Sequence, residues 1–199
     1  MGVISFLEVF DIAVMSLFLG YLFHDVVFPR HRAVLVDPEL TYKHGFDWKS
    51  FWYATAALAP SVILHELAHK FVAMGYGMEA TFHAFYANSF TFLLGIFAIA
   101  SKVFNFGFFL LVPGFVSIRG TGTPLEFGLI AFAGPAVHLI LWLGSMLVLK
   151  VHKKLSSTQK VMVILVKQIN MFLFIFNMLP IPGFDGFSVY SNILRGLGG

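Results

Sequence analysis

The sequence of 199 residues contains no cysteine. Disulfide bonds and thiolate chemistry are therefore excluded, both as structural cross-links and as catalytic groups. Any metal ion that the chain holds tightly must be bound by histidine, aspartate, glutamate or asparagine side chains instead.

Charged residues are also scarce: they make up 12% of the chain, whereas 58% of the residues are hydrophobic and 25 are phenylalanine. A soluble domain of this length could not bury so much apolar surface and still cover itself with polar groups. Long runs that are nearly free of charge are typical of membrane helices. We therefore predict a multi-pass integral protein of the cell membrane that is in contact with lipid. The net charge of +3 is small and its basic residues are scattered or lie in loops, which argues against a nucleic-acid partner.

Four apolar runs have about the 20 residues that a helix needs to cross a bilayer. The predicted spans are residues 3–23, 51–74, 127–149 and 161–180. The first run lacks a basic leader and a small-residue cleavage site, so it is expected to be a retained span rather than a signal peptide. It contains Glu8 and Asp11, which we expect to cap its start; the alternative is that they mark a polar gate beside a functional site.

The region 86–118 is apolar but interrupted by Lys102 and Asn105, and each half is short for a full crossing. It predicts a re-entrant or interfacial hairpin, with a possible short β segment near "FVSI". The expected fold class is an all-α integral membrane protein, a polytopic helical bundle of about four main spans plus this hairpin. The tail after residue 186 predicts a short amphipathic helix. No repeat or second domain is visible, so residues 1–199 are expected to form a single domain with a catalytic core at about 51–195.

The apolar run "SVILHELAHKF" contains the motif His65-Glu66-Leu67-Ala68-His69. On a helix, residues four apart lie on the same face, so both imidazoles can reach one metal ion. Zinc is the metal that such sites usually carry in hydrolases, with three protein ligands and one open position. Glu66 would then act as general base and acid on a water molecule at the metal. The alternative is that these are polar residues at a helix interface, but ionisable residues inside a span are costly and usually functional.

A third metal ligand is sought among the carboxylates that follow His69, which are Glu79, Glu126 and Asp185. Glu79 and Glu126 lie in segments that are expected to be solvated. Asp185 lies in "NMLPIPGFDGF", where two prolines forbid a continuous helix and two glycines permit tight bends. Irregular backbone at membrane depth is tolerated where it lines a cavity, which favours Asp185 as the ligand. An ordinary turn that leaves the membrane is the alternative for this segment.

These motifs together resemble the site-2 protease family of intramembrane zinc metalloproteases. The resemblance rests on "HELAH", on "AFAGPAVHL" at 131–139 and on "FNMLPIPGFDG" at the end of a later span, and it covers roughly residues 55 to 195. It implies one zinc ion held by His65, His69 and Asp185, with Glu66 as the general base. Asn177 would be the donor that steadies the oxyanion or positions the scissile carbonyl, while helix–helix hydrogen bonding is its alternative role.

The resemblance also implies the substrate, a membrane protein cut in or near its transmembrane segment, usually after another protease has trimmed it. Such a helix must unwind to present a carbonyl. The segment "LVPGFVSIRG" is similar to the family's segment that meets the substrate as a strand, so "GFVSI" is expected to hold the unwound chain by backbone hydrogen bonds.

Two further functions stay open. The first is a non-catalytic metal-binding membrane protein or transporter that uses the same histidines. The second is an inactive relative that binds transmembrane helices without cutting them. A membrane zincin of the type completed by a downstream glutamate would need a Glu-x-x-x-Asp/Glu helix after the first motif, and the sequence has none.

Two opposite orientations in the membrane are predicted, one from the charge of the loops and one from the resemblance. The loops 24–50 and 150–160 hold eight of the 13 lysines and arginines, and the positive-inside rule places them in the cytosol. The family topology implies the opposite, with the metal site nearer the cytosolic side.

Overall fold

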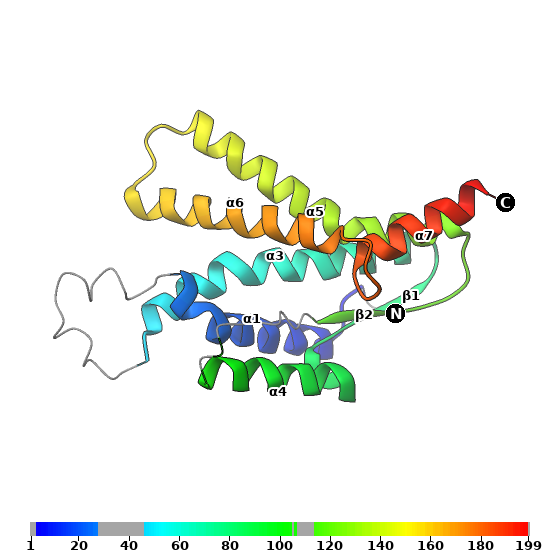
Figure 1. Ribbon diagram of the computed structural model, residues 1–199, viewed down its shortest axis with the longest axis horizontal. Helices are drawn as coiled ribbons and strands as arrows, with labels where there is room; N and C mark the ends of the chain where they lie inside the picture. The colour runs from blue at the N-terminus through cyan, green and yellow to red at the C-terminus, as the bar shows by residue number, and fades with distance from the viewer. Residues whose placement is uncertain (1–2, 28–45, 105, 107–113, 199) are drawn as a thin grey trace.

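The computed structural model describes residues 3–27, 46–104, 106 and 114–198. Helices dominate it, and its two strands form one small antiparallel sheet (Figure 1). In chain order the elements are α1 (Phe6–Val27), α3 (Trp48–Gly75), β1 (Glu79–His83), the short 3-10 helix η2 (Phe85–Ala87), α4 (Ser89–Val103), β2 (Phe115–Arg119), α5 (Pro124–Val151), α6 (Ser157–Asn177) and α7 (Asp185–Leu197). The predicted all-α class is confirmed. Most of the predicted loop 24–50 and part of the predicted hairpin, at 105 and 107–113, lie outside the described residues.

In the described part of the chain, three helices are long and apolar enough to cross a membrane: residues Phe6–Asp25 of α1, and α5 and α6 in full. The sequence predicts α3 as a fourth span, and its 28 residues exceed the length required. It is not one of the three because its polar residues lower its mean hydropathy. Those polar residues are tolerated because α3 lies between α1 on one side and α5 and α6 on the other, so protein rather than lipid covers them (Figure 1).

The apolar core of the bundle is built around α3. Leu19 of α1, Val62 of α3 and Leu173 of α6 belong to one buried cluster. The helices α1 and α3 approach closely at Gly20, which has no side chain: a Cβ added there would lie 2.0 Å from Thr55 Oγ1. Small residues at such crossings are what allow membrane helices to pack tightly.

The outer surface carries many large apolar side chains, among them Phe90, Leu93 and Phe97 of α4 and Ile140 and Leu147 of α5. Contiguous exposed apolar surface of this kind marks contact with a partner or a membrane. It is the surface that lipid would cover around the apolar helices.

The chain turns back as the predicted hairpin requires, because the strands on either side of α4 pair with each other; whether the hairpin is re-entrant or interfacial stays a prediction. β1 and β2 are antiparallel, with Glu79 opposite Arg119 and His83 opposite Phe115, so the chain that leaves β1 through α4 returns to the same place. The short strand expected near "FVSI" is β2; its partner β1 was not predicted. β1 follows α3 directly, after a turn in which Gly77 has a φ of 78°, a conformation that favours glycine.

The predicted break after the last long helix is also confirmed. α6 ends at Asn177, and Pro180 and Pro182 prevent it from continuing. Gly183 turns the chain with a φ of 98°, and α7 begins at Asp185. A Cβ added at Gly186 would lie 2.5 Å from the carbonyl oxygen of Met178, so the start of α7 packs directly on the end of the break.

A buried polar chain links the three central helices. His138 Nδ1 of α5 donates to Asn170 Oδ1 of α6 at 2.9 Å, and Asn170 Nδ2 donates to Ser61 Oγ of α3 at 2.9 Å. His138 thus makes a polar contact between helices inside the bundle. Because Asn170 Nδ2 also donates to Val166 O, its amide orientation is set and the proton of His138 lies on Nδ1.

Candidate metal centre

The two histidines of the first motif converge through the geometry of α3. His65 and His69 are one helical turn apart and buried, and their Nε2 atoms lie 3.1 Å from each other. Two ring nitrogens this close, both pointing to one place, form the arrangement that a shared metal ion requires.

Asp185 completes the cluster from the far end of the sequence. Its Oδ2 lies 3.1 Å from His65 Nε2 and its Oδ1 lies 3.5 Å from His69 Nε2. Burial opposes ionisation of Asp185, but the contacts with His65 and His69 hold the pKa of its carboxyl below the usual range. The carboxylate is therefore ionised and ready to bind a cation.

The competing carboxylates lie elsewhere. Glu79 is the exposed first residue of β1. Glu126 forms a capping box with Thr123 at the start of α5, where each residue binds the other's backbone N–H. Within the described residues, His65, His69 and Asp185 are the group whose ligand atoms all lie within 4.8 Å of one another.

These three residues fit zinc by distance and by chemistry. Ligand atoms about 2.0–2.2 Å from a tetrahedral zinc ion lie about 3.3 Å from one another, which matches the separations of 3.1, 3.1 and 3.5 Å found here. His69 donates its other ring nitrogen, Nδ1, to Ile130 O at 2.7 Å, an outer contact that metal-bound histidines commonly make. His65 Nδ1 is buried, with no hydrogen-bond partner among the described residues.

Gly134 of the "AFAGP" segment in α5 lies directly against this cluster. A Cβ added at Gly134 would lie 2.3 Å from His69 Nε2 and 2.6 Å from His65 Nε2. The space that converging ligands leave for an ion thus exists because position 134 has no side chain. Pro135 follows within the helix, and both residues are buried.

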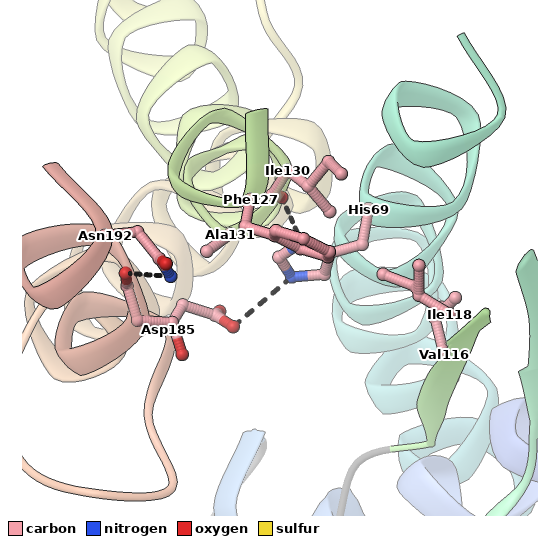
Figure 2. A pocket seen from close by; sticks show the side chains of 9 residues that line it. His69, Val116, Ile118, Phe127, Ile130, Ala131, Asp185 and Asn192 are labelled. Carbon is pink, nitrogen blue, oxygen red and sulfur yellow. Dashed lines mark hydrogen bonds and ion pairs between the residues drawn. The ribbon is translucent and has the colours of Figure 1, made fainter. Parts of the chain in front are cut away.

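A pocket of about 270 Å³ opens beside the cluster. Figure 2 shows His69 and Asp185 facing each other across it, with β2 on one side and α7 on the other. Its lining consists of His69, Val116 and Ile118 of β2, Phe127, Ile130 and Ala131 of α5, and Asp185, Ser188 and Asn192 of α7. The pocket thus combines apolar walls with a polar end at the cluster, the composition typical of ligand sites.

Glu66 and Asn177 have different positions relative to this pocket. Glu66 is buried next to His65 and lies close enough to interact electrostatically with both histidines and with Asp185. Asn177 is the half-buried last residue of α6 and is not part of the pocket lining. Its role as oxyanion donor stays a prediction.

Several residues that were not predicted as site residues also lie around the cluster. The ring of His138 lies 4.7 Å, centroid to centroid, from that of His65 and tilts 30° from it. Ser188 and Asn192 follow Asp185 at positions i+3 and i+7, the spacing of one helix face, so the helical tail could have indicated them. Lys70 is buried directly after His69, and a lysine inside an apolar run is itself a signal that a partner exists.

Comparison with known proteins gives two relatives. The chain is 37% identical over 143 residues to the Methanocaldococcus jannaschii protein provisionally named zinc metalloprotease MJ0611, covering 71% of each chain. It is 30% identical over 151 residues to the Synechocystis protein provisionally named zinc metalloprotease sll0528, covering 75% of this chain but 33% of that one. No family model matches the chain, and neither does any solved structure.

Replacement of Gly134 by alanine tests the fit of a metal ion. The added methyl group would push the two imidazoles apart, and we expect the affinity for zinc to fall about tenfold or more, the range seen when the surroundings of metal ligands are altered. Zinc affinity is measured by competition with a chromogenic chelator.

Gly144→Ala is the matched control in the same helix, because nothing lies within 4 Å of a Cβ added there. It should bind zinc like the wild type. Equal zinc affinity in the two variants would show that the ion does not lie against Gly134.

Proposed function

The chain belongs to a family of zinc metalloproteases, and from that premise we propose that it is an intramembrane protease of the site-2 type. Its substrate would be a membrane protein, cut at a peptide bond in or near a transmembrane segment. The supporting observation is one juxtaposition: two residues of the histidine–aspartate cluster line a pocket whose opposite wall is a strand, β2.

The open edge of β2 is what favours a peptide substrate. β2 pairs with β1 on one side, and in the described part of the chain no strand pairs with its other side. Val116 and Ile118, which alternate along β2, line the pocket. A peptide added as a third strand would gain backbone hydrogen bonds from β2 and carry its carbonyls past His69 and Asp185.

The position of the cluster in the bundle agrees with a reaction that consumes water. The sheet and α7 lie at one end of the bundle, opposite the loop that joins α5 to α6 (Figure 1), and Asp185 of the cluster is the first residue of α7. A transmembrane substrate helix would need to unwind only near this end. The free-energy cost of unpaired backbone N–H and C=O groups in the hydrocarbon would then be limited to a few residues.

Each residue of the site would have its own role in the hydrolysis of the peptide bond. His65, His69 and Asp185 would hold zinc, which when bound polarises a carbonyl and makes water acidic enough to lose a proton near neutral pH. Glu66 would take that proton as the water oxygen adds to the carbonyl carbon. It would then deliver the proton to the amide nitrogen as the C–N bond breaks. Asn177 would donate to the oxyanion, a contact worth about 3 kcal/mol where it is well placed.

A metal-binding protein or transporter is the second candidate, and the buried histidine–aspartate cluster alone would suit it. It has no evident use for a strand with an open edge beside the ion. Glu66, buried next to the cluster but not itself part of it, also favours a catalytic role.

Glu66→Gln separates the two functions. The amide cannot accept the proton, so we expect the rate of cleavage to fall by about 10²–10⁴-fold while zinc binding is retained. The assay follows a membrane-protein substrate in detergent or vesicles, with a chelator-treated and zinc-restored sample beside it. Glu79→Gln, at an exposed glutamate of β1, is the control and should cleave normally. Full cleavage by Glu66→Gln would contradict the proposed mechanism.

Val116→Pro tests strand addition. Phe82 is the partner of Val116 in the sheet, and its N–H points away from β2, toward Glu8. Phe82 and Val116 are therefore a non-hydrogen-bonded pair, in which the backbone groups of both residues point away from each other. The N–H of Val116 consequently lies on the edge of β2 that does not face β1. Proline removes that donor without removing a bond between β1 and β2. The KM should rise about 2- to 10-fold, the equivalent of one net hydrogen bond, with zinc affinity unchanged. An unaltered KM would show that substrate does not pair with β2.

A further inference from the structure

Glu8 of α1 occupies a position that capping does not explain. The predicted cap is present, since Ser5 N donates to Glu8 Oε2 at 2.8 Å and Glu8 N donates to Ser5 Oγ at 3.3 Å. The other oxygen, Oε1, accepts from Phe82 N of β1 at 2.8 Å and from Lys70 Nζ of α3. One carboxylate thus joins the first helix, the metal-binding helix and the sheet.

The ion pair between Glu8 and Lys70 lies in the interior. Glu8 is 3% exposed and Lys70 is 2% exposed. A charge is costly to bury, and a buried pair is kept only where both partners are matched by good geometry and further hydrogen bonds. Lys70 directly follows His69, so Glu8 is attached to the part of α3 that carries the metal cluster.

The backbone bond to Phe82 attaches β1 to α1 at a point away from the turn that joins β1 to α3. β1 leaves α3 through Tyr76–Met78, where Gly77 adopts a positive φ. A glycine turn is a natural hinge. Phe82 lies four residues beyond Met78, so its bond to Glu8 is a second attachment point that prevents the strand from swinging about Gly77.

The same contact decides which edge of the sheet stays open. The N–H of Phe82 lies on the outer edge of β1, where it would be available to pair with another strand. Glu8 occupies it, and Phe82 itself is packed in a cluster with Met15 of α1. β1 is therefore closed by α1, and β2 is the edge left beside the pocket.

A second acid of α1 reinforces this attachment. Asp11 lies one turn after Glu8, and its Oδ1 accepts a hydrogen bond from Tyr86 Oη in η2, just after β1. The two carboxylates predicted as caps or as a gate thus both contact the segment 82–86 from the same helix.

We propose that Glu8 and Lys70 are positioning residues that hold the β1–β2 sheet in a fixed place relative to His65, His69 and Asp185. The inference rests on the proposed function, in which β2 receives the substrate. Neither residue touches the reacting peptide; they act through the sheet, by determining which carbonyl of a bound strand lies at the metal ligands.

The test measures the sheet directly, without relying on catalysis. Because the chain has no cysteine, spin labels can be attached to cysteines that replace Trp52 of α3 and Arg119 of β2, both exposed. Pulsed EPR then gives the distribution of distances between α3 and the sheet. Glu8→Gln, which leaves the Lys70 ammonium buried without its counter-charge, should broaden this distribution.

Asp25→Asn is the matched control. Asp25 is also an α1 carboxylate that pairs with a lysine, Lys102, but it is 61% exposed, and its other ion-pair partner is His24 of α1 rather than a residue of the sheet. Its variant should leave the distribution unchanged. The double variant Glu8→Gln/Lys70→Met should restore the narrow distribution, because glutamine still accepts from Phe82 N and no unpaired charge remains. If Glu8→Gln alone does not fold, recovery of folding in the double variant would show that the unpaired charge of Lys70 is the cause.

Cleavage gives the second readout. In Glu8→Gln the KM should rise about tenfold with kcat little changed, the pattern of lost substrate binding, and cuts should spread to neighbouring peptide bonds. Both effects should be reversed in the double variant, and zinc affinity should stay as in the wild type. An equally narrow distance distribution in Glu8→Gln would overturn the positioning role even if the protein is a protease. If the wild type cleaves no membrane protein, the proposed function fails, and the EPR result still decides whether Glu8, with its charge matched by Lys70, fixes the sheet.

Discussion

The structure depends on bringing two imidazoles and one carboxylate from distant parts of the chain to one buried point. Two of them come from a single turn of α3, where the helix itself provides the 3.1 Å approach of His65 and His69. The third, Asp185, lies more than a hundred residues later and must be carried there by the rest of the fold. α5 passes so close at Gly134 that any side chain there would collide with the two imidazoles. Without a cation, two imidazoles and a carboxylate would share a largely buried site for no structural benefit.

This requirement accounts for much of the architecture. α3 lies in the middle of the bundle because its polar residues need protein around them on several sides. The break at Pro180 and Pro182 is what turns the chain so that α7 can begin with its acidic residue beside α3. β1 and β2, the paired strands on either side of α4, lie next to α3, and among the described residues no strand covers the second edge of β2. The pieces around the site are thus connected: ligands, strand and anchoring carboxylate all meet at the C-terminal end of one helix.

Local features of the site could be predicted from the sequence, and long-range pairings could not. Residues four apart lie on the same face of any helix, so the convergence of His65 and His69 follows from their spacing. The prolines and glycines around Asp185 predict that a helix ends there. The strand β2 was indicated by its β-branched residues, whereas "EATFH" of β1 has no pattern that distinguishes it from a turn. The partners of His138 and Lys70, which are Asn170 and Glu8, lie 32 and 62 residues away. Polar residues in apolar runs indicate that partners exist, but only the packing of the helices shows which ones they are.

The central claim is that one zinc ion binds to His65, His69 and Asp185. X-ray absorption spectroscopy at the zinc edge tests it most directly, on the purified chain loaded with one equivalent of zinc. The account predicts a four-coordinate ion with two imidazole nitrogens and carboxylate oxygen at about 2.0–2.2 Å, and loss of the imidazole signal when both histidines are replaced by alanine. A zinc ion surrounded by water oxygens, or an imidazole signal that survives the double replacement, would contradict it.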